Sequence, residues 1–227
     1  DYTLLTRPVS YLELSWESLD GKEHNVHINI AANEELCLDE ADQSPVETEK
    51  VSAGKTVGMK MGNTVQKPLN RSGDDVRIDW GYFYLMTDSE NAEAFSAKVW
   101  SDDHAHVGAE LKEGKRMMYY FAYDDIVSIE YFGKHLKSYW NKDGKTILEA
   151  IAEAAEEYDE IKIRCQVFSE KLYADAFEAG GEKYAELLSL AYRQVIAAHK
   201  LVLDENGEIL YISKECNSNG CAATVDV

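Results

Sequence analysis

The sequence predicts a mixed α+β chain, with an N-terminal antiparallel β-sandwich followed by a long helical hairpin and a β-hairpin. Two periodicities predict this class. In the first half, apolar Leu12, Leu14 and Trp16 alternate with polar residues, and similar short runs follow with turn signals between them. In the second half, apolar residues recur at steps of three and four, which is typical of an amphipathic helix.

The predicted strands differ in which faces they bury. The run at 76–84 alternates strictly and is expected to face the sandwich core, whereas 116–123 is apolar on both faces and is expected to be a central strand. Asp20-Gly21 predicts a hairpin turn between the first two strands. The stretch 87–114 is expected to be irregular. Strands are predicted at 12–16, 26–30, 34–39, 47–52, 56–61, 76–84 and 116–123.

One long helix is predicted from Thr146 to Glu178, because Thr146 is a good N-cap residue and Gly180-Gly181 would end the helix. A second helix follows from Glu182, and the two would pack antiparallel. A β-hairpin is then expected over 201–212. The expected division is a β-sandwich domain at 1–125, a junction at 126–145, and a helical hairpin, β-hairpin and terminal loop at 146–227.

The charge balance limits the classes of partner. The 42 acidic residues against 23 basic ones give a formal net charge of −19. The acidic charge argues against binding to the phosphates of a nucleic acid, which needs clustered Lys and Arg. It also argues against binding to an anionic membrane surface. No apolar run is long enough to span a bilayer, and no signal peptide opens the chain.

Cysteines and histidines give weak signals. Cys37 and Cys165 lie on apolar patterns and are expected to be buried thiols. Cys216 and Cys221 could be free thiols or a disulfide, and the sequence leaves both open. The DDHAH run with His104 could bind a metal, but a solvated loop is the preferred interpretation, so neither a metal nor a cofactor is expected.

The densest group of reactive side chains is the C-terminal run 211–227, YISKECNSNGCAATVDV. Glu215 and Asp226 are candidate catalytic carboxylates. Lys214 and Asn219 are candidate substrate-binding donors. The alternative is a structural loop in which the same charges form ion pairs or cap helices.

A second candidate region is the junction 122–140, AYDDIVSIEYFGKHLKSYW. Asp124 and Asp125 are paired carboxylates among aromatic residues, and both are candidate substrate-binding residues. Such a junction is either the wall of a pocket or a packed interface, and aromatic residues favour the interface.

Several long runs resemble the glutaminase A family of fungi and bacteria, in the same order along the chain. They are RPVSYLELSWESLDGKEH, DDVRIDWGYFYL, AYDDIVSIEYFGKHLKSYW, GGEKYAELLSLAYRQVIAAHKLV and SKECNSNGCAATVDV. Family members are several times longer. The resemblance therefore implies an internal segment that holds the β-sandwich and the opening helices of an (α/α) barrel-like catalytic domain.

The resemblance also implies a secreted or periplasmic enzyme that hydrolyses L-glutamine to L-glutamate and ammonia, with the segment alone inactive. The resemblance does not identify the catalytic residues. In such chemistry Glu215 or Asp226 would act as general base or acid. Two alternatives stay open. One is a glycoside-hydrolase-like enzyme with two carboxylates. The other is a non-catalytic binding or docking module, which would expose Trp80, Tyr82 and Tyr84 in a row.

Overall fold

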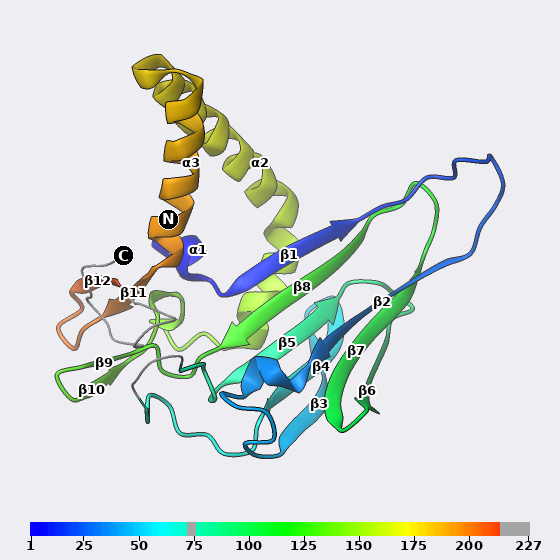
Figure 1. Ribbon diagram of the computed structural model, residues 1–227, viewed down its shortest axis with the longest axis horizontal. Coiled ribbons are helices and arrows are strands. Elements are labelled where there is room, and N and C mark those ends of the chain that lie inside the picture. Colours follow the sequence, from blue (N-terminus) through cyan, green and yellow to red (C-terminus); the bar gives the residue numbers. More distant parts are fainter. Residues whose placement is uncertain (72–75, 214–227) are drawn as a thin grey trace.

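The computed structural model describes residues 1–71 and 76–213 of the 227-residue chain. It confirms the predicted fold class, because a two-sheet antiparallel sandwich is followed by a long helix pair and a β-hairpin (Figure 1). Among the described helices, none combines the length and the apolar character that crossing a bilayer requires.

The larger sheet has five antiparallel strands. Its order is β1-β8-β5-β4-β3. The strand bounds are β1 Val9–Leu14, β3 Val46–Ala53, β4 Thr56–Asn63, β5 Tyr82–Thr87 and β8 Met117–Asp124. β8 lies between β1 and β5, so the two-sided apolar run at 116–123 is a central strand, as predicted.

The smaller sheet has the order β2-β7-β6. Its strands are β2 Val26–Asn33, β6 Glu93–Val99 and β7 Asp102–Leu111. The prediction of an irregular stretch at 87–114 is therefore wrong. So is the hairpin between the first two strands. Gly21 does form a turn, with φ +69°, but β1 pairs with β8 and β2 pairs with β7, in different sheets.

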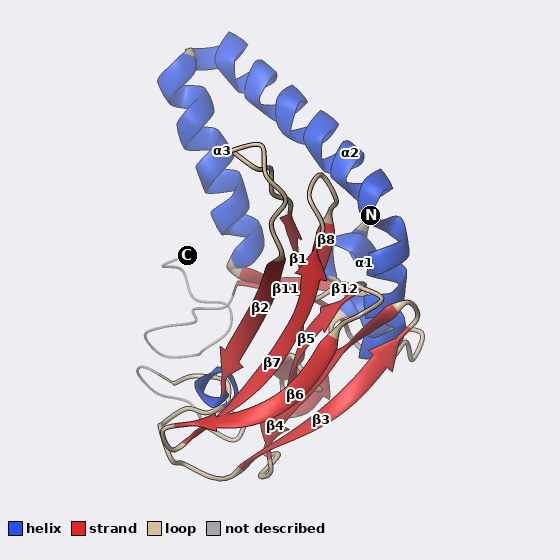
Figure 2. Cartoon of the chain, turned by 90° about the vertical axis from the view of Figure 1, so that its right-hand side faces the viewer, coloured by secondary structure: helices blue, strands red, loops and turns tan. Residues whose placement is uncertain are grey.

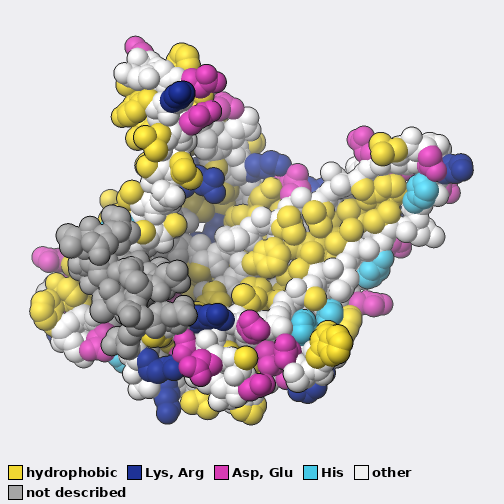
Figure 3. Space-filling model, in the orientation of Figure 1, with side chains coloured by type: hydrophobic (Ala, Val, Ile, Leu, Met, Phe, Trp, Pro, Cys, Tyr) yellow, Lys and Arg dark blue, Asp and Glu magenta, His cyan; other side chains and the backbone are white. Residues whose placement is uncertain are grey.

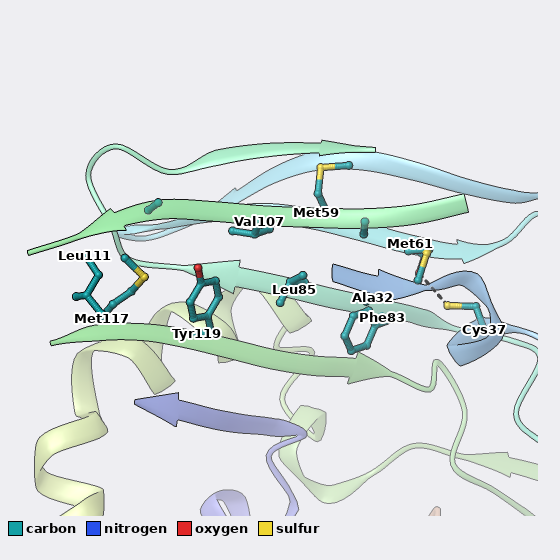
Figure 4. Close-up of a cluster of buried hydrophobic side chains, with 12 residues drawn as sticks. Ala32, Cys37, Met59, Met61, Phe83, Leu85, Val107, Leu111, Met117 and Tyr119 are labelled. Atoms are coloured by element: carbon teal, nitrogen blue, oxygen red, sulfur yellow. Dashed lines mark hydrogen bonds between the residues drawn. The ribbon is translucent and has the colours of Figure 1, made fainter. Parts of the chain in front are cut away.

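The sandwich core lies between the sheets and is apolar (Figure 4). Met117 and Tyr119 of β8 point into it, and Cys37 donates a hydrogen bond to the Met61 carbonyl at 3.4 Å. The alternate β8 residues Met118 and Tyr120 instead pack in a second cluster, on the opposite face of the larger sheet. A strand that is covered on both sides needs apolar residues at every position, which explains the β8 sequence.

Two strand predictions near η1 and β5 are wrong in detail. The run at 34–39 forms the 3₁₀ helix η1, Glu34–Cys37, because the Asn33 side chain accepts a hydrogen bond from the Glu35 amide and caps it. The alternating run at 76–84 becomes a strand only from Tyr82. Tyr84 packs in the second cluster rather than between the sheets, so the set expected to fill the sandwich core partly covers its outer face.

The long helix is α2, Ile147–Gly180, and its start and end are as predicted. Thr146 forms a capping box with Glu149, in which each side chain bonds the other's backbone amide. At the far end Gly181 has φ +78°, which L side chains resist, and α3, Glu182–Ala197, begins there.

The first half of α2 covers the outer face of the larger sheet. Ile147 and Ile151 pack on Tyr84 and Tyr120 in the second cluster. Further along, α2 and α3 extend together beyond the sheets (Figure 2). There the apolar stripe is open: Cys165 is exposed, so the prediction of a buried thiol holds for Cys37 and is wrong for Cys165.

Small elements connect the helices to the sandwich. The predicted β-hairpin is present as β11, His199–Leu203, and β12, Ile209–Ser213. Val202 of β11 forms a buried cluster with Ile129 and Leu136. The remaining elements are α1 Tyr2–Thr6, β9 Ile129–Tyr131, β10 Lys134–Leu136 and η2 Tyr139–Asn141.

Candidate functional site

A polar cavity of about 370 Å³ opens where the larger sheet meets the start of α2. Its walls come from β5, the end of β8, η2 and the first turn of α2. This is the junction that the sequence marked as either interface or pocket wall, and the structure contains both. Trp140 is buried in the packed cluster beneath α2 and also lines the cavity. The full lining is Tyr84, Asp124, Ile126, Lys137, Trp140, Asn141, Gly144, Lys145, Thr146, Ile147 and Leu148.

Asp124 is the last residue of β8, and its carboxylate lines the cavity. Its Oδ1 accepts a hydrogen bond from the Ile126 amide at 3.0 Å, which turns the chain sharply out of the strand. Among the described residues, no donor bonds Oδ2. One carboxylate oxygen therefore holds the turn, and the other is available to a ligand.

Burial raises the pKa of Asp124, and the neighbouring charge of Asp125 adds to that effect. The Ile126 amide, Lys137 and Lys60 act in the opposite direction without cancelling it. A half-buried carboxylate with a raised pKa in a cavity is a common property of functional sites.

Gly81 allows the strand ends to approach closely enough to form this corner. Its φ is +84°, and a Cβ atom there would lie 2.2 Å from the Asp124 carbonyl oxygen. The Gly81 amide donates to Gln66 Oε1 at 2.6 Å, which fixes the start of β5. The backbone around Asp124 is therefore held by a contact that tolerates only glycine.

Asn141 contains a buried acceptor without a partner. Its Oδ1 has no hydrogen-bond partner among residues 1–71 and 76–213. Asn141 ends η2 and is one of the residues that line the cavity, but Oδ1 itself is shielded from solvent. Buried acceptors are almost always paired in native proteins, so this unpaired oxygen costs stability.

Two lysines also line the cavity, but only one is engaged. Lys145 Nζ lies 2.6 Å from Glu153 Oε2 on α2. Lys137 is exposed, forms no ion pair within the described part of the chain, and acts on Asp124 through its charge. The cavity lining therefore combines a carboxylate with an ammonium group that has no ion-pair partner among the described residues.

Asp125 faces elsewhere. Its Oδ2 accepts a hydrogen bond from Ser128 Oγ at 2.7 Å and lies 3.3 Å from Lys200 Nζ of β11. Its carbonyl accepts from Trp80 Nε1 at 2.8 Å. The adjacent aspartates therefore differ in position: Asp124 lines the cavity, and Asp125 joins β8 to β11. The predicted substrate-binding role of each remains a prediction.

The other four predicted site residues, Lys214, Glu215, Asn219 and Asp226, lie outside the described residues. So do Cys216 and Cys221. Their catalytic and substrate-binding roles remain predictions.

His104, which the DDHAH run offers as a candidate metal ligand, lies in β7, so the prediction of a solvated loop for this run is wrong. Its Nδ1 lies 3.2 Å from the Asp102 carbonyl, while the neighbouring His106 stacks flat on Phe95 at 4.8 Å. Within the described ranges, no group of three or more His, Cys, Asp or Glu side chains is placed to hold a metal ion.

The sequence did not single out Lys137 or Asn141 as site residues. Lys137 stands in the charged and aromatic junction stretch, so its proximity to Asp124 was a usable signal. Asn141 follows Trp140 without any motif. Its importance arises from the burial of Oδ1, which depends on how η2 packs beneath α2.

Comparison with known proteins matches two segments of the chain to protein families. Residues 1–114 match a family described as a domain of unknown function (DUF5127), and residues 181–227 match the glutaminase A six helical-hairpin domain. Glutaminase A from Aspergillus oryzae (strain ATCC 42149 / RIB 40) is 22% identical to this chain over an alignment 252 residues long. The alignment covers 96% of this chain and 36% of that relative. The chain thus spans little more than a third of the relative's length, and the matches support a glutaminase A-like family.

Proposed function

This chain belongs to the family described as a domain of unknown function (DUF5127), and on that premise we propose that it is an internal segment of a glutaminase A-like amidohydrolase. The reaction proposed is hydrolysis of L-glutamine to L-glutamate and ammonia. The observation that carries the proposal is the alignment of 96% of the chain with Glutaminase A. The six helical-hairpin match over 181–227 supports it independently.

Amide hydrolysis requires an activated water, a proton for the departing nitrogen and donors for the developing oxyanion. Water attacks the side-chain carbonyl carbon, the C–N bond breaks, and ammonia leaves after taking up a proton. We assign the base and acid roles to Glu215 and Asp226, and oxyanion stabilisation to Lys214 and Asn219. Asp124 binds substrate in this proposal, and no cofactor takes part.

The remainder of the parent protein is the proposed partner of the helical hairpin. An apolar cavity of about 750 Å³ lies between α1, α2 and α3, and it is lined by Leu5, Phe168 and Tyr192 among others. Hydrophobic side chains are also exposed along the projecting part of the hairpin, among charged ones (Figure 3). About half or more of the surface of several of these residues is exposed: 53% for Phe177, 63% for Leu187 and 49% for Val195.

Isolated apolar faces of this kind are normally covered in a complete domain. The description of a six helical-hairpin domain supports further hairpins as the cover. We therefore propose the division of the chain into a sandwich at 1–125, a junction at 126–145, and the first part of a helical domain at 146–227. On this view the segment alone is inactive. We also propose a secreted or periplasmic location.

The alternative functions have less support. A binding module was expected to expose Trp80, Tyr82 and Tyr84 in a row on one sheet face. Trp80 and Tyr84 are only 7% and 5% exposed, and Tyr82 is half-buried. These three rings therefore form no exposed row. A glycoside hydrolase needs two carboxylates at a defined separation, and among the described residues Asp124 is the one carboxylate that lines the cavity, because Asp125 faces Lys200.

The test uses the full-length protein that contains this chain. Ammonia release from L-glutamine is compared with sugar release from model glycosides. We expect ammonia and no sugar, whereas sugar without ammonia would replace this function by the glycosidase alternative. Glu215→Gln and Asp226→Asn should each reduce turnover strongly. If both variants retain wild-type turnover, the terminal run is structural.

A further inference from the structure

We propose that the junction cavity binds the head group of an α-amino acid, with the ammonium at Asp124 and the carboxylate at Lys137. The choice of an amino acid over other small zwitterions rests on the proposed function. The carboxylate and the ammonium that line the cavity point to a ligand that carries a cation and an anion close together.

The cation subsite is the free carboxylate oxygen of Asp124. Asp124 Oδ2 carries charge and lacks a donor within the described residues, and Asp124 lines the cavity. An ammonium group presents three donors and a positive charge, so it can donate to this oxygen and balance the charge of the carboxylate.

The anion subsite is Lys137. Its ammonium lines the cavity and has no carboxylate partner among the described residues other than the charge of Asp124. The first turn of α2 does not compete for this role, because the Thr146 amide and hydroxyl are already bonded to Glu149 Oε2, both at 2.8 Å.

Size and surroundings agree with a small ligand. The cavity of about 370 Å³ is at the lower end of small-molecule sites. Tyr84, Trp140 and Ile147, which are buried, form its apolar wall. These residues would contact the aliphatic part of an amino acid, while the charged groups hold its head.

The test is a set of binding cycles on the full-length protein, using ligands that are not turned over. Calorimetry measures the Kd of L-glutamate, of glutaric acid, which lacks the α-ammonium, and of 4-aminobutanoate, which lacks the α-carboxylate. In the wild type each truncated ligand should bind at least tenfold more weakly than L-glutamate.

The variants assign each contact. In Asp124→Asn, L-glutamate and glutaric acid should bind with about equal Kd. In Lys137→Met, L-glutamate and 4-aminobutanoate should bind with about equal Kd. Asparagine retains an acceptor for the Ile126 amide, and Lys137 is exposed, so both variants are expected to fold. Lys142→Met is the matched control, because Lys142 lies near the cavity but does not line it.

Unchanged preferences in both Asp124→Asn and Lys137→Met would overturn the head-group site. Ammonia release on the same samples separates this result from the proposed function. If the ligand preferences change in the variants as expected but no ammonia is released, the site is upheld and the glutaminase assignment is contradicted. If ammonia is released but the variants leave the ligand preferences unchanged, the glutaminase assignment is upheld and the site is contradicted.

Discussion

The Nζ atom of Lys200 lies 3.3 Å from Oδ2 of Asp125, which joins β11 to the end of β8. The two residues are 75 positions apart in the chain. Their contact connects the hairpin that follows the helices to the sandwich that precedes them. It also fixes the backbone next to Asp124, whose side chain lines the junction cavity.

Asp125→Ala should lower the free energy of unfolding by about 1–2 kcal/mol. It removes the acceptor of Ser128 Oγ and the partner of Lys200, and charged hydrogen bonds in partly buried positions contribute on this order. The measurement is urea unfolding. Asp143→Ala is the control, because that side chain is 81% exposed and its removal should change stability by less than about 0.5 kcal/mol. Equal effects would contradict a structural role for Asp125.

Gly81→Ala should be more destabilising than Gly133→Ala. Both glycines have positive φ, at +84° and +76°, so each substitution carries backbone strain of about 1–2 kcal/mol. Only at Gly81 would the new Cβ also meet the Asp124 carbonyl oxygen, at 2.2 Å, which should add about 1–3 kcal/mol. Equal losses in thermal unfolding would contradict the tight corner at Asp124.

Asp124→Asn should stabilise the protein increasingly as the pH rises. Because burial raises the pKa of Asp124, the folded state binds its proton more tightly than the unfolded state does. Wild-type stability therefore falls as the pH rises through and above the ordinary aspartate range, near about 3.9. Asparagine removes that loss.

The measurement for Asp124 is the difference in unfolding free energy between variant and wild type from pH 3 to pH 7. We expect it to increase and then level off. Asp143→Asn provides the exposed comparison. A difference that decreases with pH would mean that Lys137, Lys60 and the Ile126 amide stabilise the carboxylate more than burial and Asp125 destabilise it.

Asn141→Leu should raise the stability of the unliganded protein. An unpaired buried acceptor costs about 1–3 kcal/mol, and leucine removes it while the cavity beside it leaves room for the extra methyl groups. A gain of about 1 kcal/mol corresponds to a Tm increase of roughly 2–4 °C. Asn91→Leu, at an exposed position, should give no gain. A lower Tm for Asn141→Leu would show that the side chain is already satisfied.

Leu187→Glu tests whether further chain covers the helical hairpin. Leu187 is 63% exposed, so in the isolated 227-residue chain this change should alter stability by less than about 0.5 kcal/mol. In the full-length protein it should cost about 2 kcal/mol or more, because a charge would be buried. Glu186→Gln, at the neighbouring exposed position, should be neutral in both. A small effect in both proteins would contradict coverage of this face.

Local patterns in the sequence predicted much of the fold. The two-sided apolar run of β8 predicted a central strand, and the Thr146 cap with Gly180-Gly181 predicted the limits of α2. Non-local pairing could not be read in the same way. Asp20-Gly21 marks a true turn, but the partner of Val9 is Ala122, and no local signal identifies it.

The candidate site was predicted only in part. Asp124 was identified because paired carboxylates stood in an aromatic stretch, and the same signal could not show that Asp125 faces Lys200. The unpaired oxygen of Asn141 exists only because η2 packs beneath α2. The helical period likewise predicted burial for Cys165, whose exposure reflects the lack of a covering element in the described chain.

The central claim is that this chain is part of a glutamine-hydrolysing enzyme. The most direct measurement is the release of ammonia and L-glutamate from L-glutamine by the full-length protein. The account predicts equal amounts of both products, with turnover reduced in Asp124→Asn and unchanged in Asp143→Asn. A correctly folded full-length protein that releases neither product would contradict it.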